Sequence, residues 1–251
     1  MPLPLRPLRF VVIALLLAGC GKDGTSGTPL ATARFSFVHA LPDTGNLDVR
    51  ANATLSSALT AIPYGTATAY QAIPVGSASF SVQSSPSTSA DVPRAFSNLS
   101  GIQLSSGMSV TLVAAGRVRD TAGTNAPAVT PYIDDSSAPG TGQSRFRVIN
   151  ASPDAGAIDV FVTPAGALRT LTPQIAGVDY RSAVSRTYSS GSYVILITAL
   201  SDQATVLATG GITLLDGGAQ TVVLRGFAGT LPTGVSADRR VGITTMVNRA
   251  P

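Results

Sequence analysis

The sequence has few of the side chains on which many enzymes and metal sites depend. It contains one histidine, His39, one cysteine, Cys20, and no tryptophan. Any Ser-His-Asp or Cys-His catalytic machinery would therefore have to use His39. An ordinary zinc site is excluded, because it needs several His and Cys ligands. We expect His39 to serve as a turn or packing residue at the end of a strand, and we expect no metal and no cofactor.

Charged residues are also scarce, at 12% of the chain, with a formal net charge of +4. Nucleic-acid binding calls for Lys and Arg gathered on one face or stripe. Here the charges are dispersed, and the longest basic run is Arg239-Arg240. We therefore expect no nucleic-acid partner.

Long apolar runs are missing as well. A spanning helix needs about 20 apolar residues, whereas the run from Phe10 to Leu17 is soon interrupted by Gly19 and by the charged pair Lys22-Asp23. Two arginines, at positions 6 and 9, precede this run. A short basic stretch followed by a short apolar one is typical of an export signal peptide, which we place at residues 1–19.

The end of that segment, Leu17-Ala18-Gly19-Cys20, resembles the lipobox of bacterial lipoproteins. The resemblance implies cleavage between Gly19 and Cys20 and a lipidated Cys20 that holds the mature chain on a membrane through several acyl chains, each CH₂ contributing about 0.8 kcal/mol. Lipidation would also account for a single cysteine in an exported protein. Gly21 stands where an Asp would favour the inner membrane, so we expect the outer membrane. The alternative is an ordinary signal peptide with an incidental cysteine.

An internal repeat organises the rest of the chain. Residues 34–49 align with residues 145–160 at an offset of 111, and Gly101-Ile102-Gln103-Leu104 aligns with Gly211-Ile212-Thr213-Leu214 at an offset of 110. A repeat of this length is too long for a solenoid unit and suits a whole β-sandwich domain. We predict two such domains, residues 31–138 (copy one) and 143–251 (copy two). Residues 20–30 form a flexible tether after the lipidated cysteine, and residues 139–142 form a hinge.

Within each copy the pattern is that of strands. Phe35 and Phe37 alternate with polar neighbours, and in residues 145–148 two apolar residues alternate with Arg145 and Arg147, which predicts a buried apolar face and solvent-exposed arginines. Gly210-Gly211 and Gly217-Gly218 are interpreted as turns rather than a phosphate loop, because no helix follows them. No segment outside the signal peptide has a convincing helical pattern. We predict an all-β fold.

The block at residues 145–160, RFRVINASPDAGAIDV, and its variant at residues 34–49 resemble the start of the DUF4397 domain. That resemblance implies immunoglobulin-like β-sandwich modules, often in tandem, of uncharacterised function in exported bacterial proteins. Tyr64-Gly65 and residues 73–76 of copy one also fit the family pattern. Copy two departs from it at residues 178–180 and 188–191.

Both copies repeat a pair of aspartates: Asp43 and Asp48 in copy one, Asp154 and Asp159 in copy two. Two nearby carboxylates can bind Ca²⁺ or act as acid and base. The simpler interpretation is that the first aspartate caps its Pro-Asp-x-Gly turn and the second lies on the solvent face of a strand. We favour that interpretation, and we expect Asp134-Asp135 to be solvated linker charges.

The tyrosines at positions 64, 70, 180 and 188 could form an aromatic binding surface, but packing is the expectation we favour, because aromatic residues are common in strands. Compartment, repetition and the scarcity of catalytic residues together favour a non-catalytic binding or structural module for an envelope protein or polysaccharide. The alternatives are an envelope hydrolase that uses the duplicated aspartates and a passive spacer.

Overall fold

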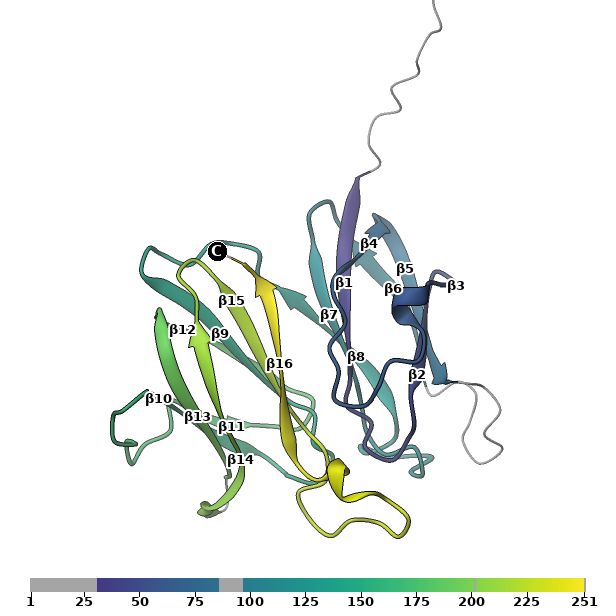
Figure 1. Ribbon diagram of the computed structural model, residues 1–251. Coiled ribbons are helices and arrows are strands. Elements are labelled where there is room, and N and C mark those ends of the chain that lie inside the picture. The colour runs from purple at the N-terminus through teal and green to yellow at the C-terminus, as the bar shows by residue number, and fades with distance from the viewer. Residues whose placement is uncertain (1–30, 86–96, 201, 251) are drawn as a thin grey trace, which may run out of the picture. The chain divides into compact units, whose positions relative to one another are not determined.

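Alternating apolar residues and glycine-rich turns produce a fold whose described regular elements are strands apart from two short 3-10 helices (Figure 1). The computed structural model describes residues 31–85, 97–200 and 202–250. Copy one contains β1 (Thr32–His39), β2 (Leu47–Ala51), β3 (Thr54–Leu55), the 3-10 helix η1 (Ser57–Leu59), β4 (Gln71–Pro74), β5 (Gly76–Ser84), β6 (Ser97–Leu104), β7 (Ser109–Ala115) and β8 (Ala128–Asp134).

Copy two contains β9 (Gln143–Asn150), β10 (Ile158–Pro164), β11 (Ile175–Val178), β12 (Ala183–Ser189), β13 (Gly191–Ala199), β14 (Asp202–Leu214), β15 (Ala219–Arg225), the 3-10 helix η2 (Ala237–Arg239) and β16 (Gly242–Arg249). The predicted all-β fold class is therefore confirmed.

Each copy is a sandwich of two four-stranded sheets, and the two copies share one topology. The sheets have the orders β4-β1-β7-β8 and β3-β2-β5-β6 in copy one, and β12-β9-β15-β16 and β11-β10-β13-β14 in copy two. In both copies the first strand pairs in parallel with the seventh, β1 with β7 and β9 with β15. The duplicated sequence thus encodes two sandwiches that match strand by strand.

Each sandwich has its own apolar core between its two sheets. In copy one, Phe35 and Phe80 come from opposite sheets and their rings meet edge to face at 4.8 Å. In copy two, Phe146 on β9 meets Tyr188 edge to face on the neighbouring strand β12 of the same sheet, with ring centroids 6.0 Å apart. The aromatic residues predicted to face inward do so, since Phe35 and Phe146 are buried.

A third apolar cluster joins the two copies. Equivalent positions of the repeat meet in it: Val38 with Ile149, Ala40 with Ala151, and Val113 with Val223. These side chains come from β1 and β7, from β9 and β15, and from the residues just after β1 and β9. Because both copies contribute the same patch, the contact is self-complementary, like the interface of a symmetric dimer. The β4-β1-β7-β8 and β12-β9-β15-β16 sheets therefore each pack on both faces.

Residues 31–251 form one compact unit. The segment predicted as a hinge is hydrogen-bonded to copy two, with Gly142 N–H donating to Asp216 at 2.7 Å and Ser190 N–H donating to the Gly142 carbonyl at 2.8 Å. The predicted domain boundaries stay a prediction. Within the described part of the chain, no helix has the length and apolar character that crossing a bilayer requires.

The interpretation of Gly210-Gly211 as a turn is wrong, because both residues lie inside β14. A side chain at Gly210 would come within 2.7 Å of Ile243 on the opposite sheet, so glycine makes room for that core residue. Gly217, with a φ of +68°, does occupy a turn.

Candidate functional site

The duplicated turns hold the first aspartate of each copy at the end of the sandwich. Asp43 accepts hydrogen bonds from the backbone N–H groups of residues 118 and 119, at 2.8 and 3.2 Å. Asp154 accepts the equivalent bonds from residues 228 and 229, at 2.8 and 3.1 Å. The expectation that these aspartates cap their own turn is wrong in detail. Each carboxylate instead fastens the turn to the loop that follows the seventh strand of its copy.

The second aspartate of each pair is buried, which corrects the expectation of a solvent-facing position. Asp48 is 7% exposed and Asp159 is 1% exposed. Asp48 accepts the N–H of Ala61 at 2.8 Å, and Asp159 accepts the N–H of Gly177 at 3.0 Å and a side-chain bond from Gln203 at 3.0 Å. In copy one the donor lies in the loop after η1, whereas in copy two Gly177 lies on β11 and Gln203 on β14. Both carboxylates are therefore acceptors for neighbouring parts of their own copy.

His39 is fully buried at the end of β1. Its Nε2 lies 2.8 Å from the Gly45 carbonyl, and its Nδ1 accepts the N–H of Leu41 at 3.3 Å. An Nδ1 that accepts requires a neutral ring with the proton on Nε2. Burial lowers the His39 pKa from 6.5 to about 4. The histidine therefore organises the turn as a neutral group, as expected.

Copy two makes the same arrangement with an amide. Asn150 donates from Nδ2 to the Gly156 carbonyl at 2.7 Å, and its Oδ1 accepts the N–H of Ser152 at 3.2 Å. The partners occupy the same places in the motif as those of the histidine in copy one. Histidine and asparagine are thus interchangeable at this position, because each presents one donor and one acceptor.

The interface between the copies contains a buried polar cluster around Asp134, which is 6% exposed. Its Oδ1 accepts hydrogen bonds from Arg147 at 2.6 Å and from Thr111 at 2.8 Å. Its carboxylate also accepts bonds from Tyr70 at 2.6 Å and from Asn248 at 3.2 Å. The expectation that Asp134 is a solvated linker charge is therefore wrong, whereas Asp135 is exposed as expected.

Arg147 is only 8% exposed, so the predicted solvent position of this arginine is also wrong. It donates to Thr111 of copy one at 3.0 Å and to Thr221 of copy two at 2.9 Å. Thr221 in turn donates to Asn248 at 2.5 Å. Arg147 belongs to the inner sheet of copy two, where the strand face opposite the core meets copy one instead of water. Strand alternation correctly predicted that Arg147 lies on the face of β9 opposite the core, but it did not predict that copy one covers this face.

A second inter-copy contact surrounds Tyr64. The guanidinium carbons of Arg225 and Arg239 lie 4.7 and 4.3 Å from its ring centroid. Gly65 leaves the space for Arg225, because a side chain there would come within 2.6 Å of the guanidinium. The Gly65 carbonyl accepts a bond from Thr244 at 2.7 Å. Tyr64 is therefore held between two arginines of copy two.

Tyr180 and Arg181 of copy two occupy the places of Tyr64 and Gly65, because Arg181 N–H donates to the strand-end Asn150 carbonyl as Gly65 N–H does to His39. Sequence comparison missed this equivalence, since arginine replaces glycine. The Arg181 side chain donates to the Ala115 carbonyl of copy one at 2.8 Å, and its own carbonyl accepts the Tyr132 hydroxyl at 2.9 Å.

The four tyrosines considered as a binding surface are packing residues, as expected. Tyr70 and Tyr180 contact the inter-copy cluster, Tyr188 contacts the core of copy two, and Tyr64 lies between the arginines. Burial, followed by the charge of Asp134, raises the Tyr70 pKa to about 12. Tyr70 therefore keeps its proton at neutral pH and donates a hydrogen bond to Asp134.

The site residues predicted for lipidation and cleavage, Cys20 and Gly19, lie outside the described residues. Among the residues that the structure does describe, no three His, Cys, Asp or Glu side chains gather as a metal site would require.

A sequence model of the family described as "Domain of unknown function (DUF4397)" matches residues 33–161, which include nearly all of copy one, the strand β9 and the first part of β10. No curated protein matches the sequence. A solved structure described as "Alpha-glucan recognition by family 41 carbohydrate-binding modules from streptococcal virulence factors" aligns at 15% identity over 76% of this chain and 92% of that one, with a TM-score of 0.28. "The Bacillus anthracis TIE protein" aligns at 9% identity over 78% of this chain and 33% of that one, with a TM-score of 0.24.

Proposed function

The chain belongs to the family described as Domain of unknown function (DUF4397), and we propose that it is a lipid-anchored bacterial envelope protein acting as a non-catalytic binding or structural module. Its partner would be an envelope protein or polysaccharide. Export and the anchor are supported by the signal-peptide layout and by the lipobox-like sequence that ends at Cys20.

The observation that carries the non-catalytic role is the use made of the duplicated carboxylates. Asp43 and Asp154 each accept two backbone N–H groups, and Asp48 and Asp159 are buried and each accept one backbone N–H. A general base or nucleophile needs a lone pair directed at substrate. Here the lone pairs are directed at the protein's own backbone, so the motif builds the ends of the two sandwiches.

The inter-copy contacts support presentation of loops by a rigid support. Asp134 and Arg147 form a buried ion pair across the interface, and Tyr64 lies between two arginines of the other copy. Because the two copies are fixed to each other, the loops of both copies keep constant relative positions. This preorganisation lowers the conformational entropy that is lost when a partner binds.

The test measures saturable binding of the purified mature protein to the isolated cell envelope, untreated, protease-treated or periodate-oxidised. Loss of binding after protease identifies a protein partner, and loss after periodate identifies a polysaccharide. Absence of saturable binding would leave only the structural role. Turnover of ester, peptide or glycan substrates that disappears in Asp43→Asn or Asp154→Asn would overturn the non-catalytic proposal.

A further inference from the structure

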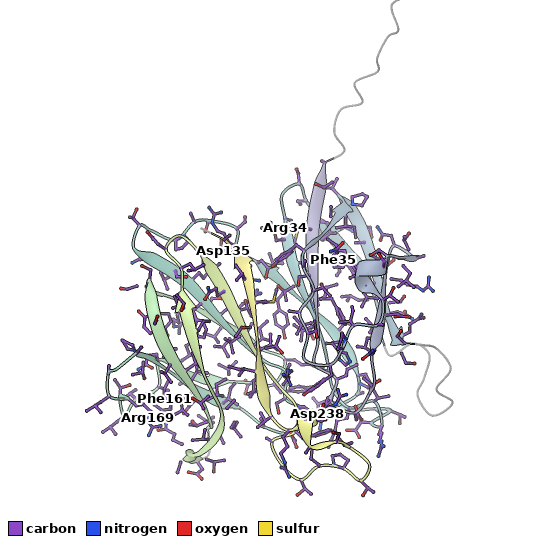
Figure 2. The ribbon with its side chains drawn as sticks, in the orientation of Figure 1. Arg34, Phe35, Asp135, Phe161, Arg169 and Asp238 are labelled. Atoms are coloured by element: carbon purple, nitrogen blue, oxygen red, sulfur yellow. The ribbon has the colours of Figure 1, made fainter. Side chains whose placement is uncertain are left out.

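A cavity of about 260 Å³ opens between the two copies, beside the duplicated turn of copy one. Residues 42–45 of that turn form one wall, and residues 234–236 of copy two form part of the opposite wall. Arg119 and Arg239 complete the lining. Helix η2, which Asp238 marks in Figure 2, ends at Arg239.

Two buried polar atoms in this lining have no hydrogen-bond partner. They are Thr44 Oγ1 and Arg239 Nη1. Thr44 as a whole is only 7% exposed. An unpaired buried donor loses hydration without compensation, which is costly, and a guanidinium N–H costs more than a neutral one. Native structures satisfy nearly all such groups with protein or water partners, so Thr44 and Arg239 each keep hydrogen-bonding capacity beside the cavity.

The charges around the cavity favour an anion. The carboxylate of Asp43 is already occupied by two backbone N–H groups. Asp238 contacts Arg239 only at Nε, at 3.3 Å, and its side chain is 63% exposed. Burial is the largest cause that lowers the pKa of the nearby His39, and the charges of Arg239 and Arg225 lower it further, so the positive charge of both arginines reaches this turn. Arginine pairs well with carboxylate and phosphate, whose oxygens match its planar fork of donors.

Copy two serves as an internal comparison, because it has the same Pro-Asp-x-Gly turn but lacks the side chains that line the cavity in copy one. Asp154 makes the same two backbone bonds as Asp43, which sets the residues of the two loops in register. At the positions of Thr44 and Arg119, copy two has Ala155 and Gly229. The threonine and the arginine are therefore not needed to build the turn.

We propose that this cavity binds an oxyanion, namely a carboxylate or phosphate group, through Arg119, Arg239 and Thr44. This inference deepens the proposed function. It rests on that function in one respect, namely that the carboxylate or phosphate group would belong to the envelope partner. Arg119 and Arg239 would bind the anionic oxygens, and the Thr44 hydroxyl would donate to one of them.

The test is isothermal titration of the full mature lipoprotein in detergent at fixed ionic strength, with inorganic phosphate, D-glucuronate and the neutral D-glucose as probes. We expect saturable binding of phosphate or glucuronate and none of glucose. Arg119→Gln and Thr44→Val should each weaken binding about tenfold, the scale of one charge-assisted hydrogen bond. These two variants avoid Arg239, whose loss would also disturb Tyr64.

Arg186→Gln is the matched control, because Arg186 is exposed on β12 and donates a hydrogen bond to the neighbouring Ser185 carbonyl. It should leave affinity unchanged, and circular dichroism should confirm that all variants are folded. Phosphate binding alone would identify a phosphate group, and glucuronate binding alone a carboxylate. No anion binding, equal binding of glucose, or unchanged affinity in both cavity variants would overturn the inference. Envelope binding that persisted in that case would leave the proposed function standing.

Discussion

Arg147 on β9 donates a 2.6 Å hydrogen bond to Asp134 on β8, and the two residues belong to different copies of the repeat. Their side chains are 9% and 4% exposed. Two charges buried together in this way require each other, because removing one leaves the other unpaired in a medium of low dielectric constant.

The first prediction concerns this pair. Asp134→Ala should lower the free energy of unfolding by about 3 to 5 kcal/mol, because it strands the Arg147 guanidinium in the interface. Asp135→Ala is the control, since Asp135 is exposed and its ion pair with Arg145 lies at the surface, where such pairs contribute little. Urea titration followed by circular dichroism measures both. Equal losses in the two variants would contradict the structure of the interface.

The second prediction concerns His39. Its pKa is about 4 in the fold and about 6.5 when unfolded, so the unfolded chain binds the proton more readily. Stability is fully present above pH 6.5 and is lost as the pH falls towards 4, by about 3 kcal/mol in all.

His39→Asn provides the control, because asparagine makes the same two bonds at position 150. The variant should fold normally at pH 7 and should lose stability less steeply than wild type between pH 6.5 and 4. The difference between the two curves isolates the histidine from the aspartates that titrate nearby. Parallel curves would show that His39 is not the neutral buried group described above.

The third prediction separates a structural from a metal role for the duplicated aspartates. Asp43→Ala and Asp154→Ala should each cost about 2 kcal/mol, because each carboxylate pairs two backbone N–H groups. The melting temperature of wild type should be the same in millimolar Ca²⁺ and in chelator. Bound Ca²⁺ would instead stabilise the fold by an amount that grows with the logarithm of its concentration above the dissociation constant. A Ca²⁺-dependent rise in melting temperature that is lost in Asp154→Ala would contradict the structural role.

These residues show how far sequence reasoning reaches. The duplicated block and the alternation of Phe35 and Phe37 with polar neighbours predict two all-β copies, because strand period and turn chemistry are local properties. The environments of Arg147 and Asp134 are not local. The two residues are 13 positions apart in the sequence, and Asn248, which also donates to Asp134, is 114 positions from it. Alternation assigns Arg147 to the face away from the core, and the sequence context of Asp134 predicts a solvated linker charge. Only the packing of the copies shows that both side chains are buried.

The same limit applies to the candidate sites. The Pro-Asp-x-Gly motif identifies Asp43 as a conspicuous residue, but its partners lie about 75 residues further along. The oxyanion cavity needs Thr44 of copy one beside Arg239 of copy two, and no spacing in the sequence relates them. In copy two the counterparts of Thr44 and Arg119 are Ala155 and Gly229. This difference is present in the sequence but becomes meaningful only with the structure.

The fourth prediction concerns the proposed domain boundaries. Fragments 31–138 and 143–251 should each fold with β-type circular dichroism, because each has a complete core between its own sheets. Each fragment alone exposes the apolar patch that includes Val38 or Ile149, so mixing them should give a one-to-one complex by size-exclusion chromatography. A fragment that is disordered alone and folds only with the other would argue for one intertwined domain.

The last prediction tests the lipid anchor, on which the proposed function depends most directly. The measurement is mass spectrometry of the amino-terminal peptide of the protein extracted from membranes, compared with Cys20→Ala after cell fractionation. We expect wild type to begin at Cys20, to carry acyl chains on it and to sediment with the outer membrane, and Cys20→Ala to remain uncleaved or become soluble. A wild-type protein with an unmodified Cys20, found wholly in the soluble periplasm, would contradict the account.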